Sequence, residues 1–124
     1  MPTLEVRRYR TPNGKVPLTD WLDGLRDGRT RARILARLVR LQAGLFGDWK
    51  SVGAGVYELR IDHGPGYRIY FGKEGTTPVL LLCGGDKGTQ TSDIEKAHGY
   101  WKDHKARNIL KPPIQGGKAP EERE

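Results

Sequence analysis

Two short stretches in the middle of the chain, residues 56–61 and 67–71, alternate apolar and polar side chains, which predicts two β-strands. The apolar residues stand at every second position: Tyr57, Leu59 and Ile61 in the first stretch, and Tyr67, Ile69 and Phe71 in the second. The sequence Gly-Pro-Gly between the stretches favours a turn. The register must bring both apolar sets to the same face, and the simplest register that does so sets Ile61 opposite Tyr67 and Arg60 opposite Arg68.

The N-terminal part of the chain is predicted to form a strand followed by two helices. Residues 3–10 alternate in the manner of a first strand. Apolar residues then recur at helical spacing from Leu18, with Thr19 as the candidate N-cap, and again over residues 30–43. Residues 44–55 are rich in glycine and are predicted to be a connection without regular structure.

The second half is predicted to hold a central strand and a final helix. The unbroken apolar run 79–83 is typical of a strand buried on both faces, so we expect it at the centre of the sheet. Ser92 and Glu95 have the spacing of a capping box, which predicts the start of a helix. Residues 107–124 are rich in proline, glycine and charge, which predicts a disordered tail after a single folded domain, residues 1–106.

The expected fold class is therefore α+β. An N-terminal strand and a helical hairpin precede a three-stranded antiparallel meander, the meander completes a four-stranded sheet, and a C-terminal helix follows.

The composition favours an anionic partner. The 124 residues include 22 Lys and Arg against 15 Asp and Glu, a net charge of +7, and nucleic acid is the commonest partner of such proteins. Basicity that serves solubility alone is the other explanation. No apolar run reaches the roughly 18–20 residues of a membrane span, the N-terminus lacks a signal-peptide pattern, and no Cys/His spacing resembles a zinc site. We therefore expect a cytoplasmic protein with no membrane partner and no cofactor.

The positive charge is concentrated. Residues 28–47 contain five arginines and no acidic residue. The arginines that fall along one line beside the apolar stripe of the second predicted helix are Arg29, Arg33, Arg37 and Arg40. A solvated helix face is the ordinary explanation of such a line, but solvated faces generally mix both signs of charge. We therefore expect this line to contact nucleic-acid phosphates or an acidic partner.

The hairpin register raises a question of its own, because like charges directly opposite each other are destabilising. Glu58 can neutralise one of the two arginines through a diagonal contact, which is a purely structural explanation. The functional explanation is a phosphate-binding pair, since two guanidinium groups can hold phosphoryl oxygens bidentately. The residues alone leave both explanations open.

The loop "GGDKGTQ", which follows the predicted central strand, adds a third positive charge near the hairpin. Its Lys87 stands among glycines and leads into a helix N-terminus, which itself favours anions. His63 in the hairpin turn is a candidate acid or base, or a turn residue with no role. His98 and His104 lie on the last predicted helix and are expected at the surface.

Two phrases, "GVYELRIDHGPGYRIYF" and "LLLCGGDKGTQTSDIEKA", closely resemble the phage-derived, HigB-like "addiction module killer" branch of the RelE/ParE superfamily of bacterial toxins. The resemblance covers about residues 3–106. It implies a RelE-like fold and a toxin encoded beside a cognate antitoxin, often a helix-turn-helix protein. RelE-like members cut mRNA on the ribosome, whereas ParE-like members poison DNA gyrase without hydrolysis.

The resemblance also implies site residues for a metal-independent mRNA endonuclease. The arginine of the "GYR" phrase is Arg68, the basic residue of the preceding strand is Arg60, and the loop residue is Lys87. Glu58 stands where RelE-like strands carry a lysine, and Ile94 falls near the position of a tyrosine found in some members. The two arginines would stabilise charge in the transition state, and the lysine would transfer a proton. The residues expected to contact RNA are Arg29, Arg33, Arg37, Arg40, Lys50, Tyr70 and Gln90.

The expected function is thus a toxin that inhibits translation by cleaving mRNA, with the ribosome, the mRNA and the antitoxin as partners. A gyrase poison and a non-toxic RNA-binding module are the alternatives, because a fold by itself does not decide between functions.

Overall fold

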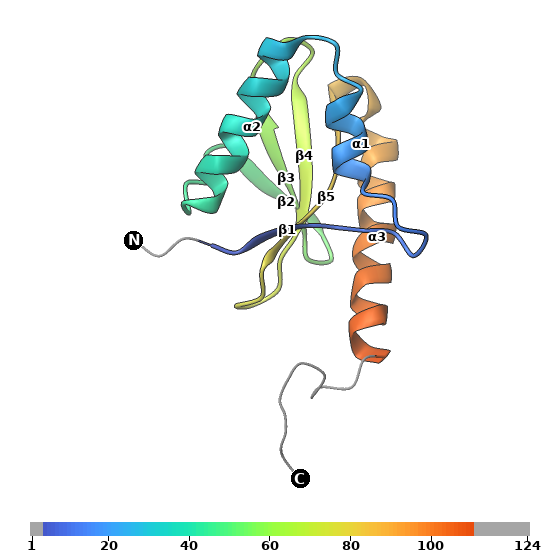
Figure 1. Cartoon of the computed structure of the whole chain (residues 1–124). Helices are drawn as coiled ribbons and strands as arrows, with labels where there is room; N and C mark the ends of the chain where they lie inside the picture. The colour runs from blue at the N-terminus through green and yellow to red at the C-terminus, as the bar shows by residue number, and fades with distance from the viewer. Residues whose placement is uncertain (1–3, 111–124) are drawn as a thin grey trace.

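The computed structural model describes residues 4–110, which form a five-stranded mixed sheet and three α-helices. The protein therefore belongs to the α+β class, and the sheet has one strand more than the sequence predicts (Figure 1). In chain order the elements are β1 (Val6–Arg8), α1 (Pro17–Asp23), α2 (Gly28–Gln42), β2 (Trp49–Gly53), β3 (Val56–Ile61), β4 (Tyr67–Gly72), β5 (Val79–Asp86), the 3₁₀ turn η1 (Lys87–Thr89) and α3 (Gln90–Leu110).

The strand order is β1-β5-β4-β3-β2. Strands β3, β4 and β5 form the predicted antiparallel meander, while β1 pairs with β5 in parallel. The predicted position of the apolar run 79–83 is wrong in one respect: β5 lies inside the sheet, between β1 and β4, but β4 occupies the centre. The run is buried because both faces of β5 are covered by helices.

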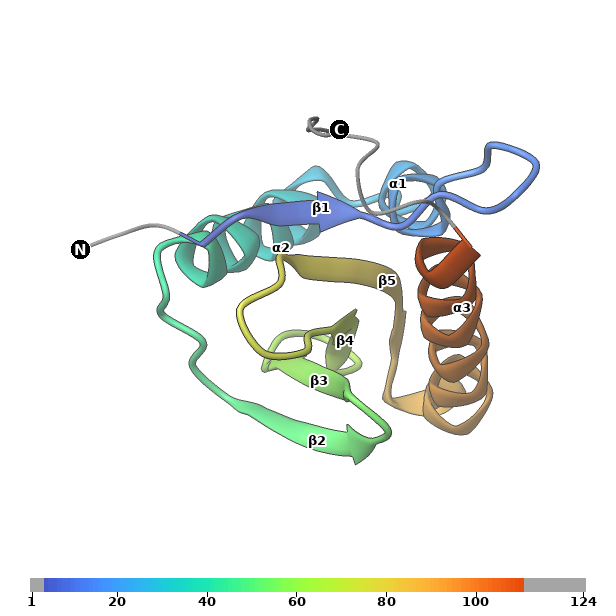
Figure 2. The same cartoon turned by 90° about the horizontal axis from the view of Figure 1, so that it is seen from below.

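Two hydrophobic cores lie on opposite faces of the sheet. Helices α1 and α2 pack against one face, where Leu18, Ile34 and Leu41 meet residues of β3, β4 and β5. Helix α3 packs against the other face through Ala97 and Trp101. Figures 1 and 2 show α3 running beside β5, apart from α2. None of the helices among residues 4–110 combines the length and the apolar character needed to cross a membrane.

The fifth strand, β2, lies in the segment predicted to be an irregular connection. Its residues pair antiparallel with β3, with Trp49 opposite Leu59 and Lys50 opposite Glu58. Four of its five residues are exposed, so the apolar alternation that reveals a strand in the sequence is nearly absent. Backbone pairing with β3 places this segment in the sheet.

Two predicted helix starts also differ from the structure. Helix α1 is preceded by Val16 as N-cap and begins with Pro17, which suits the first helical position because proline has no N–H to leave unpaired. At the other end of the chain, Asp86 and Thr89 form the capping box of η1, and Ser92 already lies inside α3. In both cases a nearby residue with suitable chemistry takes the capping role.

The predicted boundary of the folded domain falls within α3, which continues to Leu110. Arg107 lies inside this helix, where its guanidinium pairs with Asp103 at 2.7 Å and donates to the backbone oxygen of Arg10 at 2.6 Å. These contacts attach the end of α3 to the segment after β1. The rest of the predicted tail, residues 111–124, lies outside the described residues.

Close packing explains two glycines of the sheet. A Cβ atom at Gly84 would overlap the ring of Trp21 from α1, and a Cβ atom at Gly72 would overlap the ring of Trp101 from α3. Each glycine thus lets one tryptophan ring lie directly against a strand backbone.

Replacing Gly72 by alanine is expected to lower the free energy of unfolding by about 1–3 kcal/mol, the usual cost of overpacking a core. Gly99→Ala is the matched control, because the Cβ position of this helical glycine has nothing within 4 Å. The control is expected to raise the stability by about 0.5–1 kcal/mol. Urea denaturation followed by circular dichroism measures both changes, and equal effects of the two substitutions would contradict the close packing at Gly72.

Candidate functional site

Strands β3 and β4 pair in the predicted register. Ile61 lies opposite Tyr67, and Arg60 lies opposite Arg68. Residues directly opposite each other in an antiparallel pair point to the same face, so both arginine side chains lie on the face that α3 covers. The first condition for a shared site, two guanidinium groups on one face, is therefore met.

Glu58 lies between the two arginines. Its side chain is completely buried, and its Oε1 accepts a hydrogen bond from Arg60 Nε at 3.1 Å. Its Oε2 accepts hydrogen bonds from the Tyr70 hydroxyl at 3.1 Å and from Gln90 Nε2 at 2.7 Å. Arg68 Nε forms an ion pair with the same oxygen at 3.3 Å. The carboxylate thus neutralises both arginines, where the sequence indicated a diagonal contact with one.

The network keeps Glu58 ionised. Burial alone would raise the pKa of its carboxyl group, but hydrogen bonds from Arg60, Gln90 and Tyr70, together with the charge of Arg68, hold that pKa below its ordinary value. The two arginines differ in exposure: the Arg60 side chain is 35% exposed and the Arg68 side chain only 12%. Arg60 is therefore the outer member of the pair.

Lys87 lies beside the pair at the surface. A Cβ atom on Gly66 would lie 3.6 Å from Lys87 Cβ and 3.9 Å from Arg68 Nη1, so these two side chains approach each other across that glycine. Gly66 has a φ of 81°, a left-handed conformation that few other residues adopt readily. The hairpin turn thus brings the three residues assigned to cleavage, Arg60, Arg68 and Lys87, to one end of the α3 face.

Three of the predicted RNA-contacting residues also belong to this end of the sheet. Lys50 is exposed on the edge strand and lies opposite Glu58. Gln90 is half-buried at the start of α3, with its amide on Glu58. Tyr70 was predicted at an RNA surface, but it is completely buried, and burial together with the Glu58 charge raises the pKa of its hydroxyl. Tyr70 therefore supports Glu58 and is not available to RNA.

The arginine line of α2 lies on the other face of the sheet. Arg29, Arg33 and Arg40 are exposed there. Arg37 is committed within the fold, because its Nη1 donates to the backbone oxygen of Arg60 at 2.7 Å and its Nη2 donates to that of Phe46 at 3.0 Å. The structure thus separates this line from the Arg60–Arg68 pair and gives Arg37 a structural contact.

The histidines also have partners within the fold. His63 Nε2 lies 3.1 Å from the hydroxyl of Thr30 at the start of α2, and its ring stacks on Tyr67, so it faces the α2 side of the sheet. His98 and His104 were expected at the surface but are half-buried. His98 Nε2 lies 2.9 Å from the backbone oxygen of Val52, and the ring of His104 stacks on Trp101.

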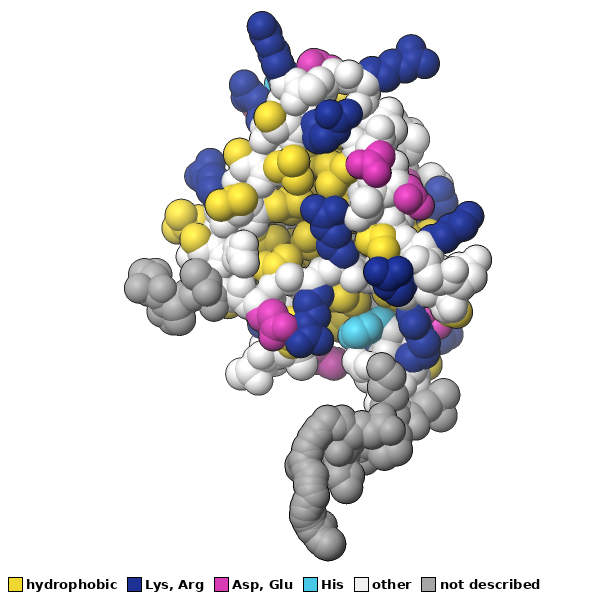
Figure 3. Space-filling view, in the orientation of Figure 1, with side chains coloured by type: hydrophobic (Ala, Val, Ile, Leu, Met, Phe, Trp, Pro, Cys, Tyr) yellow, Lys and Arg dark blue, Asp and Glu magenta, His cyan; other side chains and the backbone are white. Residues whose placement is uncertain are grey.

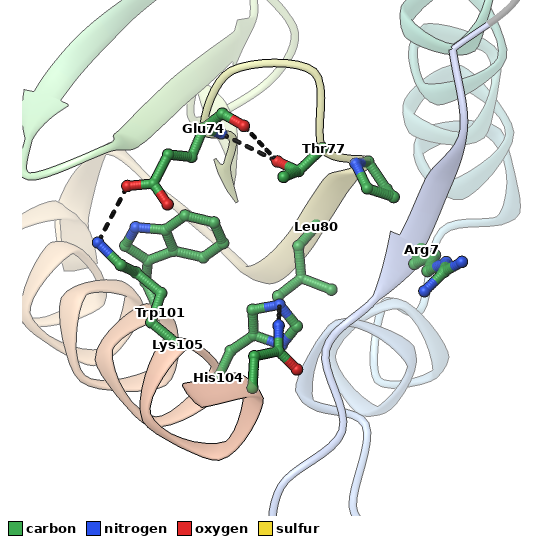
Figure 4. Close-up of a pocket in the computed structure, with 9 residues that line it drawn as sticks. Arg7, Glu74, Thr77, Leu80, Trp101, His104 and Lys105 are labelled. Carbon is green, nitrogen blue, oxygen red and sulfur yellow. Dashed lines mark hydrogen bonds and ion pairs between the residues drawn. The ribbon is translucent and has the colours of Figure 1, made fainter. Parts of the chain in front are cut away.

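A cavity of about 370 Å³ lies at the opposite end of the sheet, between the β4–β5 loop, β1 and α3 (Figure 4). Lys105 at its rim pairs with Glu74 at 3.2 Å. None of the predicted site residues lines this cavity, so it is separate from the cluster around Glu58. Among the described residues, no group of three or more His, Cys, Asp and Glu side chains is placed to hold a metal ion.

No family model matches the sequence. Over 77 residues the chain is 54% identical to a protein of Haemophilus influenzae described as uncharacterized. This match covers 62% of the chain and 78% of the Haemophilus protein.

Glu58→Gln is expected to lower the free energy of unfolding by about 3 kcal/mol at pH 7, since it breaks a buried ion pair. The folded-state pKa of Glu58 lies below the ordinary 4.5, so the stabilisation is present above that pH and is lost as the pH falls through the folded-state pKa. The difference between wild type and variant should therefore shrink below about pH 4. Denaturant titrations at pH 7 and pH 3 measure it.

Glu95→Gln is the control for this pH dependence, because Glu95 is exposed on α3. It is expected to change the stability by less than about 0.5 kcal/mol at both pH values. A deficit of the Glu58 variant that stays equal at pH 7 and pH 3 would show that the charge of Glu58 is not what stabilises the fold.

Proposed function

The chain belongs to the same family as the Haemophilus influenzae protein, and we propose that it is the toxin of a type II toxin–antitoxin system that inhibits translation by cutting mRNA on the ribosome. The observation that carries this proposal is the convergence of Arg60, Arg68 and Lys87 at one end of the α3 face. In the proposal the fold is RelE-like, with β2 added at the sheet edge, and the protein acts in the cytoplasm.

The geometry suits a phosphodiester in the act of cleavage. The 2′-hydroxyl oxygen attacks the adjacent phosphorus, the bond to the 5′-oxygen breaks, and negative charge accumulates on the non-bridging oxygens. Within residues 4–110, the Arg60 side chain donates a hydrogen bond only from Nε, so its two terminal nitrogens are free to donate to those oxygens. Donors that are fixed before the reaction stabilise this charge without further reorganisation.

Lys87 is the proton-transfer group in this proposal. It is exposed beside Arg68, so a phosphate held by the arginines would lie within reach of its amine. The ammonium group protonates the departing 5′-oxygen, and the 2′-hydroxyl proton passes to water. Arginine is unsuited to either transfer because it is effectively always protonated. In the proposal, the fixed guanidinium groups stabilise negative charge and the lysine amine transfers the proton.

The exposed arginines of α2 have a separate role in the proposal. Arg29, Arg33 and Arg40 lie on the opposite face from the cleavage site, so they cannot bind the scissile phosphate. They would instead contact phosphates of ribosomal RNA, and the affinity for the ribosome would fall steeply with salt concentration.

A surface for the antitoxin lies between α2 and β1. A groove of about 250 Å³ is lined by apolar residues that include Val6, Leu35 and Leu38, and Val39 beside them is 65% exposed. Figure 3, in the orientation of Figure 1, shows hydrophobic side chains exposed on this side of the molecule, with lysines and arginines around them. Exposed apolar patches of this kind mark protein interaction sites. An amphipathic acidic segment of a helix-turn-helix antitoxin would match both the apolar groove and the surrounding charge.

Arg60→Ala and Arg68→Ala are each expected to lower mRNA cleavage by about 10²–10³-fold, the usual loss when one donor to a developing oxyanion is removed. Both variants should also abolish growth inhibition. Primer extension on a reporter mRNA after brief induction measures the cleavage. Lys102→Ala, an exposed change on α3, is the control and should cleave as the wild type does.

Two outcomes would overturn the proposal. Double-strand DNA breaks with intact mRNA on induction would identify a gyrase poison. Harmless expression of the folded protein without an antitoxin would identify a non-toxic RNA-binding module.

Val39→Glu is expected to remove protection by the antitoxin while leaving mRNA cleavage unchanged, because it places a negative charge in an apolar groove far from the arginine pair. The measurement is growth on co-expression with the product of an adjacent helix-turn-helix gene. The control is Thr76→Glu, which adds the same charge in the exposed β4–β5 loop. A valine control such as Val52→Glu would not serve, because Val52 packs against the core under α3. Full protection of cells that express the Val39 variant would rule out this surface.

A further inference from the structure

We infer that Glu58 is the positioning residue of the cationic site. Its carboxylate holds the guanidinium groups of Arg60 and Arg68 side by side, and through Gln90 it ties the segment that carries Lys87 to the sheet. The part of this inference that concerns cleavage rests on the proposed function. The part that concerns geometry rests on the contacts alone.

The contacts of Glu58 exclude a direct role in proton transfer. Three hydrogen bonds, from Arg60, Tyr70 and Gln90, and an ion pair with Arg68 are directed at the Glu58 carboxylate. The side chain is also completely buried, so no substrate hydroxyl can reach it. A buried carboxylate that substrate cannot reach acts on a reaction only through the groups that it holds.

The four groups come from three separate parts of the chain. Arg60 precedes the hairpin turn on β3, Tyr70 and Arg68 lie on β4, and Gln90 opens α3, three residues after Lys87. Within residues 4–110, no other carboxylate pairs with either arginine. Glu58 is therefore the carboxylate that links the two arginines to each other and to Gln90, while the pairing of Asp86 with Tyr67 also holds the start of the Lys87 segment.

The way in which Glu58 binds leaves the substrate edges of the arginines open. It contacts Nε of each guanidinium and leaves the terminal nitrogens of Arg60 without a partner in the described part of the chain. Arg68 uses Nη1 only for a long contact of 3.4 Å to the backbone oxygen of Gly66. The carboxylate thus orients both groups without occupying the donors that a phosphate would need.

Stability alone does not account for this arrangement. The desolvation of a buried ion pair is seldom fully offset, and apolar residues of similar volume often stabilise a fold equally well. A buried carboxylate that holds two arginines is useful where fixed positive charge is required, because a 1 Å displacement of a catalytic group can reduce a rate by about 10²-fold.

The geometric part of the inference is tested by the Nε–H signals of the arginines in ¹H–¹⁵N spectra of the full chain. Arg60→Lys and Arg68→Lys assign the two signals. Glu58→Gln is expected to shift both signals, because both N–H groups lose their carboxylate partner, whereas the exposed Glu95→Gln should shift neither. If the folded Glu58 variant keeps both signals in place, or shifts only one, the shared positioning role is wrong.

The catalytic part is tested by single-turnover cleavage of ribosome-bound mRNA. Glu58→Gln is expected to lower the cleavage rate by about 10–100-fold, with a change of less than about threefold in the ribosome concentration at half-maximal rate. In an Arg60→Lys background, the same substitution should cost less than it does in wild type, because the two residues act together. Equal losses in both backgrounds, or cleavage at the wild-type rate, would overturn the inference.

Two further variants separate positioning from stability and guard against a Glu58 variant that fails to fold. Gly72→Ala destabilises the fold at Trp101, at the other end of the sheet, and should cleave at the wild-type rate. Gln90→Leu removes one hydrogen bond and should lower cleavage by about fivefold with the signals of Arg60 and Arg68 little changed. Wild-type cleavage by the Gln90 variant would disprove the link to Lys87.

The two proposals fail in different ways. If the wild-type protein cuts no mRNA, the proposed function falls, and the arginine spectra still decide whether Glu58 positions the pair. If the wild type cuts mRNA and Glu58→Gln cuts equally well, the proposed function stands and the positioning role falls.

Discussion

The structure depends on one buried carboxylate that serves two arginines. Glu58 and Arg60 are two positions apart on β3, so their side chains point to the same face, and the register with β4 brings Arg68 beside them. A slip of one residue would turn one arginine to the apolar core and leave Glu58 buried with fewer partners, which is costly. The apolar alternation of the hairpin and its ion network therefore require the same register, and together they specify the pairing of β3 with β4 more strongly than either does alone.

Basic side chains lie on both faces of the sheet, and some of them bond within the fold while others face solvent. On the α2 side, Arg37 and His63 fasten the helix to the hairpin through the Arg60 backbone oxygen and Thr30, while other arginines of α2 face solvent. On the α3 side, the charges gather at the end of the sheet where Gly66 lies beside Lys87 and Arg68. The net charge of +7 is thus spread over two surfaces with different surroundings.

The sequence predicts the hairpin well because apolar parity restricts the register, and the simplest register that obeys it, with Ile61 opposite Tyr67, is the one observed. The sequence does not predict β2. The residues of this strand are mostly exposed and join the sheet by backbone pairing, so they lack the alternation of apolar and polar side chains that identifies a strand. The sequence also fails at the start of α3, where Asp86 and Thr89 cap η1 with chemistry as suitable as that of Ser92 and Glu95. It places Tyr70 at a surface because the sequence does not reveal that α3 covers that row of the sheet. The shared role of Glu58 follows only when Gln90, 32 positions away, is known to lie next to it.

A carboxylate at the centre of a phosphate site weakens the attraction for an anion, so its presence needs a reason beyond charge. Two arginines without it would repel each other and sample many rotamers, and ordering them on a substrate would cost binding free energy. With Glu58 in place, this ordering takes place when the protein folds, and the substrate meets donors that are already aligned. Arg60, which is 35% exposed, and Arg68, which is 12% exposed, are then presented to the phosphate from different depths: the first from the surface and the second from beneath it, with the shared carboxylate fixing their relative position.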